Sequence, residues 1–228
     1  MLKYPCLVLD HDDTVVQSEA TVNYPCFFHF LEQYRPGTIY TFEDYVTDCS
    51  RMSFMDMCRT RFSMTEEELH QEYLFWKEYM QTHIPEPFPE IADVLHRYRN
   101  TGGKICVVSM SNEENILRDY RTHFGFEPDL VFGCDLPEQL RKPSTYPLEQ
   151  IQKHFNFSPS ELLVIDDMKF AVPMARSANC PISFAGWGRK DFPAVCHEME
   201  NLCDYTFYSP KELEKFLFDS LDSCGIIP

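Results

Sequence analysis

The chain has 228 residues, of which 44% are hydrophobic and 14% aromatic, enough for one large or two small domains with a sizeable core. Its formal net charge of −16 disfavours nucleic acid and anionic membrane surfaces as partners. No apolar run of the sequence approaches the ~20 residues that a membrane-spanning helix needs.

The cysteines point to a reducing compartment. All ten are scattered along the chain, with no Cys-x-x-Cys pair and no Cys/His array at zinc-site spacing. The first residues run directly into an apolar segment, without the pattern of a signal peptide. We therefore expect mostly reduced thiols in a cytoplasmic protein.

The first predicted strand ends in a cluster of acids. The apolar run 6–9 is followed within four residues by Asp10, Asp12 and Asp13. Such a run is typical of a buried strand, and ligands bind at the carboxyl ends of strands in open α/β sheets. Side chains two apart on an extended segment face the same way, so Asp10 and Asp12 can reach one cavity. Because clustered like charges repel, the pattern indicates a metal, a perturbed pKa, or both.

Residues 16–86 are predicted to be helical, because they contain no clear strand pattern. The segment that begins at Thr65 has a start that resembles a capping box, and a proline-rich stretch at 85–89 returns the chain as a stiff linker. The expected helices lie at about 18–34, 41–48, 54–62 and 65–82. We therefore expect a core domain of residues 1–15 and 87–228, interrupted by an inserted helical domain of residues 16–86.

Beyond the insert, apolar runs alternate with helical patterns. Strands are expected at 104–109, 130–133, 161–167 and 181–186, and helices at 91–99 and 148–155. Alternating β and α units of this length imply a parallel sheet with helices on both faces. The predicted fold class is therefore α/β, with a Rossmann-like parallel sheet core and an inserted all-α domain.

Polar side chains follow two of these later strands, and a lysine lies between them. Ser109 ends one strand, and its hydroxyl, with backbone N–H groups such as that of Met110, can hold phosphate oxygens or simply cap the next helix. Lys142 lies in a loop, where its ammonium is either an ordinary surface charge or a counter-ion for a phosphate and a carboxylate. Asp166 and Asp167 end another apolar run, as a helix cap or as ligands for a hard cation such as Mg²⁺.

Taken in order, these features resemble the signature motifs of the haloacid dehalogenase-like phosphotransferases: Asp-x-Asp-x-Thr at 10–14, a strand ending in serine, an isolated Lys-Pro at 142–143, and a strand ending in two acids. Residues 5–15 and 87–217 look like the phosphoglycolate phosphatase/β-phosphoglucomutase branch of that family. The helical insert matches the cap domain of that branch in position and length.

The resemblance implies a role for each motif residue. Asp10 would be a nucleophile and Asp12 a general acid/base. Mg²⁺ would be held by the side chain of Asp10, the backbone carbonyl of Asp12 and the side chain of Asp167, with Asp166 as a second ligand or an orienting group. The transferring phosphate oxygens would be bound by Ser109, the N–H of Met110, and Lys142.

Three positions need separate comment. Asp13 occupies the place of a glycine that the family usually has before the threonine, and we assign it no role. A later acid of the branch falls on Ala171, so Asp166 and Asp167 must supply the metal site. Arg51 in the insert is a candidate substrate ligand, with an ordinary exposed arginine as the alternative.

The expected function is a Mg²⁺-dependent phosphatase that hydrolyses a small phosphate monoester through an aspartyl-phosphate. The alternatives are a phosphomutase of the β-phosphoglucomutase type and a non-catalytic phosphate-binding or regulatory protein on the same scaffold. The expected partner is a small phosphorylated metabolite, with no nucleic acid and no membrane, and the expected assembly is a monomer or weak homodimer.

Overall fold

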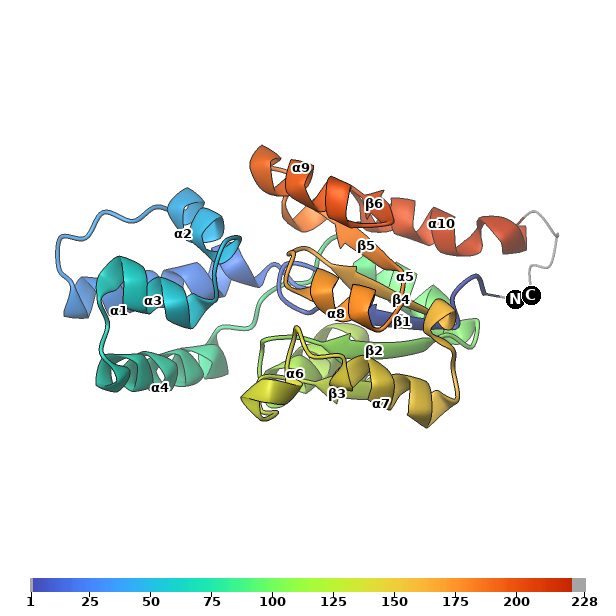
Figure 1. Ribbon diagram of the computed structural model, residues 1–228, viewed down its shortest axis with the longest axis horizontal. Coiled ribbons are helices and arrows are strands. Elements are labelled where there is room, and N and C mark those ends of the chain that lie inside the picture. The colour runs from blue at the N-terminus through green and yellow to red at the C-terminus, as the bar shows by residue number, and fades with distance from the viewer. Residues whose placement is uncertain (1, 223–228) are drawn as a thin grey trace. The chain divides into compact units, whose positions relative to one another are not determined.

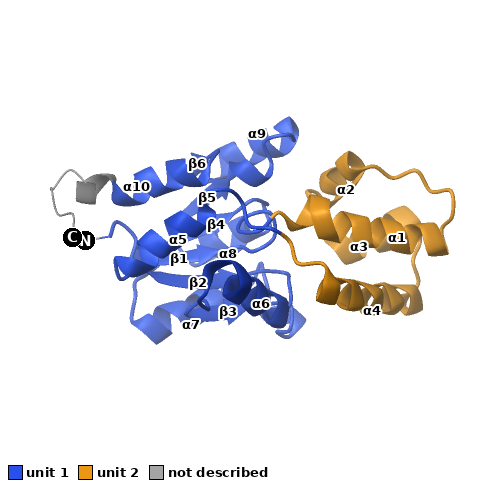
Figure 2. Cartoon of the chain, turned by 180° about the vertical axis from the view of Figure 1, so that it is seen from behind, with its two compact units in different colours: residues 1–16, 86–228 blue, residues 17–85 orange. Residues whose placement is uncertain are grey.

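Six parallel strands form the centre of the larger of two units in the computed structural model (Figure 1). The structure describes residues 2–222, and the side chains of residues 2–218. One unit comprises residues 1–16 and 86–228, and the other comprises residues 17–85 (Figure 2). The predicted α/β class, with a parallel sheet and helices on both of its faces, is confirmed.

The sheet has the strand order β3-β2-β1-β4-β5-β6, and every neighbouring pair is parallel. The central strands β1 and β4 are completely buried, which explains why they are continuous apolar runs without alternation. The strands are β1 (Cys6–Leu9), β2 (Lys104–Val108), β3 (Leu130–Phe132), β4 (Leu162–Asp166), β5 (Ile182–Ala185) and β6 (Tyr205–Phe207).

Two hydrophobic clusters cover the two faces of the sheet. Alternate residues of β1 separate into them, because successive side chains of a strand point to opposite faces: Leu7 and Leu9 join one cluster, Cys6 and Val8 the other. The first face is covered by α5 (Ile91–Asn100), α6 (Glu113–Phe124) and α10 (Pro210–Asp222). The second is covered by α7 (Tyr146–Phe155), α8 (Ala171–Ser177) and α9 (Pro193–Leu202).

Three single turns of 3₁₀-helix complete the larger unit: η2 (Glu138–Leu140), η3 (Pro159–Glu161) and η4 (Gly186–Gly188). The point where the chain leaves this unit lies beside the point where it returns. There Val16 bridges to Pro87, and the Phe88 N–H donates to the Val15 carbonyl at 3.0 Å. The insertion therefore begins and ends at one place in the α/β unit.

The smaller unit is entirely helical, as its sequence predicts. It contains η1 (Glu19–Asn23), a π-helical segment, followed by α1 (Tyr24–Tyr34), α2 (Phe42–Cys49), α3 (Phe54–Phe62) and α4 (Glu66–Thr82). Thr65 does cap α4: its hydroxyl accepts from the Glu68 N–H at 3.2 Å, and the Glu68 carboxylate accepts from the Thr65 N–H at 2.9 Å. Within the described residues, no helix of either unit has the length and apolar content to cross a membrane.

Candidate functional site

Acids lie at the carboxyl ends of β1 and β4, two neighbouring strands at the centre of the sheet. Asp10 directly follows β1, and Asp166 is the last residue of the adjacent strand β4. The Asp10 N–H donates to the Ile165 carbonyl at 2.8 Å, which ties the two strand ends together. The strand order reverses beside β1, and such a switch point is where open α/β sheets bind ligands.

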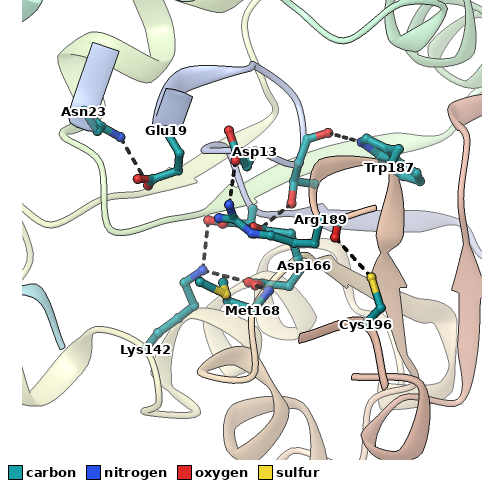
Figure 3. Close-up of polar contacts among 12 residues, drawn as sticks. Asp13, Glu19, Asn23, Lys142, Asp166, Met168, Trp187, Arg189 and Cys196 are labelled. Atoms are coloured by element: carbon teal, nitrogen blue, oxygen red, sulfur yellow. Dashed lines mark hydrogen bonds and ion pairs between the residues drawn. The ribbon is translucent and has the colours of Figure 1, made fainter. Parts of the chain in front are cut away.

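Lys142 donates hydrogen bonds to both of these acids, and Figure 3 shows it beside Asp166. Its Nζ lies 2.9 Å from Asp10 Oδ1 and 2.8 Å from Asp166 Oδ2, and its side chain is only 5% exposed. Burial alone would lower the pKa of Lys142, but the two carboxylates outweigh burial and raise this pKa above its ordinary value. The ammonium therefore stays charged and neutralises part of the acidic cluster.

Asp166 and Asp167 are both almost completely buried. Burial raises the pKa of Asp166 to about 6, although the nearby ammonium of Lys142 opposes the shift. Burial likewise raises the pKa of Asp167 well above its ordinary value, against the effect of Arg189. Desolvated acids of this kind gain from a bound cation, which would restore the charge stabilisation that water supplies elsewhere.

A divalent cation fits between three of these carboxylates. Asp10, Asp166 and Asp167 each offer one oxygen, and these oxygens lie within 4.8 Å of one another. All three donors are oxygen atoms, which suit a hard cation such as Mg²⁺. Zinc sites, in contrast, are usually rich in sulfur and nitrogen ligands. The residues present therefore fit the magnesium site that the sequence predicts.

Asp12 lies beside this group and has a different environment. Its carboxylate is half-buried, and Oδ2 accepts a hydrogen bond from the Ser111 hydroxyl at 2.7 Å. The Ser111 N–H in turn donates to the hydroxyl oxygen of Ser109 at 3.2 Å. Ser109 is buried, whereas the side chain of Met110 is 52% exposed, so Met110 can contribute only through its backbone. Ser111 had no predicted role, and its place three residues beyond the end of β2 was the available signal.

Arg189 is the second residue that the sequence analysis missed. It follows η4, its side chain is 2% exposed, and its guanidinium contacts both Asp13 and Asp167. The only local signal was its position after an apolar strand and a Gly-Trp-Gly turn. Nothing in the local pattern connects it with an acid 176 residues earlier.

Arg51 lies in the helical unit and is exposed. Its N–H donates to the Asp48 carbonyl at 2.9 Å, just beyond α2. Its role in substrate binding stays a prediction.

A sequence profile described as haloacid dehalogenase-like hydrolase matches residues 7–185. No curated protein resembles the chain closely enough in sequence to count as a match.

Several solved structures share the fold. A protein provisionally named a phosphoglycolate phosphatase from Lactobacillus plantarum is 20% identical, with 92% of this chain and 98% of that chain covered and a TM-score of 0.75. A haloacid dehalogenase-like protein of unknown function from Agrobacterium tumefaciens is 12% identical, with 96% and 99% covered and a TM-score of 0.78. CbbY from Rhodobacter sphaeroides, solved with phosphate, is 15% identical, with 93% and 96% covered and a TM-score of 0.71.

Proposed function

Because the chain belongs to the haloacid dehalogenase-like hydrolases, we propose that it is a Mg²⁺-dependent phosphatase that hydrolyses a small phosphate monoester. One observation carries the proposal: the buried ammonium of Lys142 lies 2.9 Å from Asp10 and 2.8 Å from Asp166. A cation held between carboxylates at a ligand-binding strand end is suited to a phosphoryl group, whose charge must be offset during transfer.

In the first step, a carboxylate oxygen of Asp10 attacks phosphorus, and the bond between phosphorus and the ester oxygen breaks. The leaving alkoxide takes a proton from Asp12, which thus acts as a general acid. Asp12 is suited to this role because it is half-buried and its orientation is held by Ser111. The product of the step is an aspartyl-phosphate on Asp10 and a free alcohol.

In the second step, a water molecule attacks the phosphorus of the aspartyl-phosphate. Asp12, now a carboxylate, takes the proton of that water, and the bond between phosphorus and Asp10 breaks. Inorganic phosphate leaves, Asp10 is regenerated, and Asp12 is again protonated. In both steps Lys142, the hydroxyl of Ser109 and the N–H of Met110 would bind the transferring oxygens.

When bound, Mg²⁺ would be held by Asp10, Asp166, Asp167 and the backbone carbonyl of Asp12, and it would supply charge neutralisation for the phosphate. Three buried carboxylate oxygens within 4.8 Å of one another support this ligand set.

We also propose that the core domain comprises residues 1–15 and 87–228 and that the helical insert of residues 16–86 is a cap that selects the substrate, with Arg51 as a candidate ligand. The separation of residues 17–85 as a compact unit supports this division. CbbY from Rhodobacter sphaeroides was solved with phosphate and, as a mutant, with xylulose-1,5-bisphosphate. Its similarity in fold supports a small phosphorylated metabolite as the substrate.

The test is a screen of phosphate release over sugar phosphates, phosphoglycolate and nucleotides, with the wild type and the Asp10→Asn variant. We expect Mg²⁺-dependent release by the wild type and a loss of at least about 10⁴-fold in the variant, because the change removes the nucleophile and keeps its shape. Acid-quenched wild type should carry a phosphoryl group that hydroxylamine removes, whereas Asp10→Asn should carry none.

The matched control is Asp93→Asn, at an exposed position of α5. It should keep the activity of the wild type. Retention of most activity in Asp10→Asn would exclude the covalent mechanism. Transfer of the phosphoryl group to a second position of the sugar, without release of phosphate, would identify a phosphomutase instead.

A further inference from the structure

Asp13 adopts a backbone conformation that few residues other than glycine favour. Its φ is +49°, in the left-handed region, and its N–H donates to the Val16 carbonyl at 2.8 Å. The turn is packed directly against η4, since a Cβ on Gly188 would come within 1.9 Å of the Asp13 carbonyl oxygen. A glycine would adopt this turn more easily. The buried carboxylate at this position therefore needs a reason beyond the turn itself.

Arg189 provides that reason (Figure 3). Its guanidinium donates to Asp13 Oδ2 at 2.7 Å and forms an ion pair with Asp167 Oδ2 at 2.6 Å. Its backbone is also anchored, because its carbonyl accepts from the Phe192 N–H at 2.8 Å and from the Cys196 thiol at 3.1 Å. The buried guanidinium of Arg189 thus connects the turn after β1 with Asp167, the acid that directly follows β4.

We propose that Asp13 and Arg189 act together as positioning residues that hold Asp167 in place as a ligand of the divalent cation. The inference rests on the magnesium site of the proposed function. The two side chains carry opposite charges, so as a pair they add no net charge to the acidic cluster. Their effect on a bound cation must then come mainly from the position in which they hold Asp167.

A second contact connects Asp167 with the same turn. The other oxygen of Asp167, Oδ1, accepts from the Thr14 hydroxyl at 3.4 Å. The carbonyl of Thr14 accepts from the indole N–H of Trp187 at 3.0 Å. Both oxygens of Asp167 therefore have contacts in the same region, which is formed by the turn at residues 13–14 and by residues 187–189 packed against it.

A comparison of Mg²⁺ and Ca²⁺ binding can distinguish an effect on the position of Asp167 from an effect on the local charge. Mg²⁺ requires nearly ideal octahedral geometry, whereas Ca²⁺ accepts irregular and longer coordination. Both ions carry two charges, so a change in local charge shifts the two dissociation constants by a similar factor. Misplacement of Asp167 should weaken Mg²⁺ binding much more than Ca²⁺ binding.

The experiment measures the dissociation constants of both ions by titration calorimetry, without substrate, for the wild type and the variants described below. Arg189→Lys keeps the charge but cannot bridge two carboxylates as a planar guanidinium does. We expect it to weaken Mg²⁺ binding about tenfold, as is typical when a group that orients a ligand is lost, with a much smaller change for Ca²⁺. Asp13→Gly, which suits the positive φ, should lower the ratio of Mg²⁺ to Ca²⁺ affinity to a similar extent.

The double variant tests whether the two residues act together. Combining Asp13→Gly with Arg189→Lys should lower the affinity ratio no further than either change alone, because both remove the same support. The matched control is Arg176→Lys, since Arg176 also contacts a carboxylate, that of Asp204, but is 45% exposed. This control should leave both dissociation constants unchanged.

Three outcomes would overturn the inference: an affinity ratio like that of the wild type in both single variants, equal weakening of both ions, or additive effects in the double variant. Failure of the proposed function is recognised differently, because the wild type would then bind Mg²⁺ no better than the Asp10→Asn variant. Thermal unfolding of each variant confirms that the protein measured is folded.

Discussion

The buried acids at the strand ends of the α/β unit and the buried Glu72 of the helical unit differ in their surroundings. In the α/β unit, Asp10 and Asp166 share Lys142, and Asp167 and Asp13 share Arg189. In the helical unit, Glu72 on α4 is only 5% exposed, and burial alone raises its pKa to about 7. At the strand ends, Lys142 and Arg189 oppose the rise in pKa that burial causes in Asp166 and Asp167, whereas burial is the one cause given for the raised pKa of Glu72.

The difference in surroundings indicates that the buried acids at the strand ends and the buried Glu72 have different roles. Five acids lie around the ends of β1 and β4 with two buried cations, and the folding energy that such burial costs is typical of functional sites. The pKa values of the Cys26 and Cys58 thiols are raised first by burial and then by the charge of Glu72. Burial is also the largest cause of the raised pKa of the Tyr45 phenol, followed by Glu19, with Glu72 a smaller cause. Because burial raises the pKa of Glu72, and no cation among the described residues forms an ion pair with it, the stability of the helical unit should fall as Glu72 ionises.

The two tryptophans of the chain allow the units to be followed separately. Trp76 lies on α4 of the helical unit, and Trp187 lies in η4 of the α/β unit. Trp187→Phe therefore leaves a fluorescent reporter in the helical unit, and Trp76→Phe leaves one in the α/β unit. In these single-tryptophan backgrounds, the unfolding of each unit can be followed through its own tryptophan.

The largest effect is expected from Lys142→Met, which leaves Asp10 and Asp166 buried without their shared cation. Removing one partner from a buried ion pair typically costs about 3–5 kcal/mol of stability. Phosphatase activity should also fall by at least about 10³-fold, since the variant loses its ligand for the transferring oxygens. Urea unfolding followed through Trp187, with and without Mg²⁺, measures the loss and its partial recovery by the ion.

Lys153→Met, at an exposed position of α7, is the control and should change neither stability nor activity. A Lys142→Met variant as stable as the wild type would show that Asp10 and Asp166 can be buried without the ammonium of Lys142 at no cost in stability. The proposed contrast between the two units would then be lost.

A smaller effect, with a defined pH dependence, is expected from Glu72→Gln. Between pH 4.5 and about 7 the unfolded chain releases the Glu72 proton while the folded protein retains it, so stability falls as the pH rises. Glutamine cannot ionise and removes this loss. The variant should therefore be more stable than the wild type by up to about 3 kcal/mol at pH 8, and similar to it at pH 4.5.

Denaturant unfolding across this pH range, followed through Trp76, is the measurement. Glu78→Gln, on the exposed side of the same helix, should show no such dependence. If Glu72→Gln were destabilising at pH 8, the charged form of Glu72 would have to be stabilised in the folded protein, contrary to the assigned direction of its pKa.

The smallest effect is expected from Thr65→Ala, which removes the hydroxyl that caps α4. Loss of such a cap costs about 1 kcal/mol. If the two units unfold separately, the loss should be seen through Trp76 and not through Trp187. An equal shift of both reporters would mean that the units unfold together. Thr82→Ala, at the last residue of the same helix, should have less effect than Thr65→Ala.

Much of the fold was predictable because strand and helix patterns are local. The apolar run 6–9 matches β1, and the predicted helix 54–62 has the bounds of α3. The sequence analysis did not identify α6, α8, α9, β6 or α10. β6 has only three residues, and α8 has seven with Pro173 among them, so neither carries a full period of an amphipathic pattern.

The acids of the candidate site could be found in the sequence because each directly follows an apolar run, and parallel strands end at one edge of a sheet. Local pattern also places Asp10 and Asp12 on the same side of the chain. The local sequence pattern does not indicate which cation lies between which acids. Lys142 contacts an acid 132 residues away, and Arg189 contacts one 176 residues away. Those contacts depend on the packing of separate loops over the sheet, so only the tertiary structure could give Asp13 a partner.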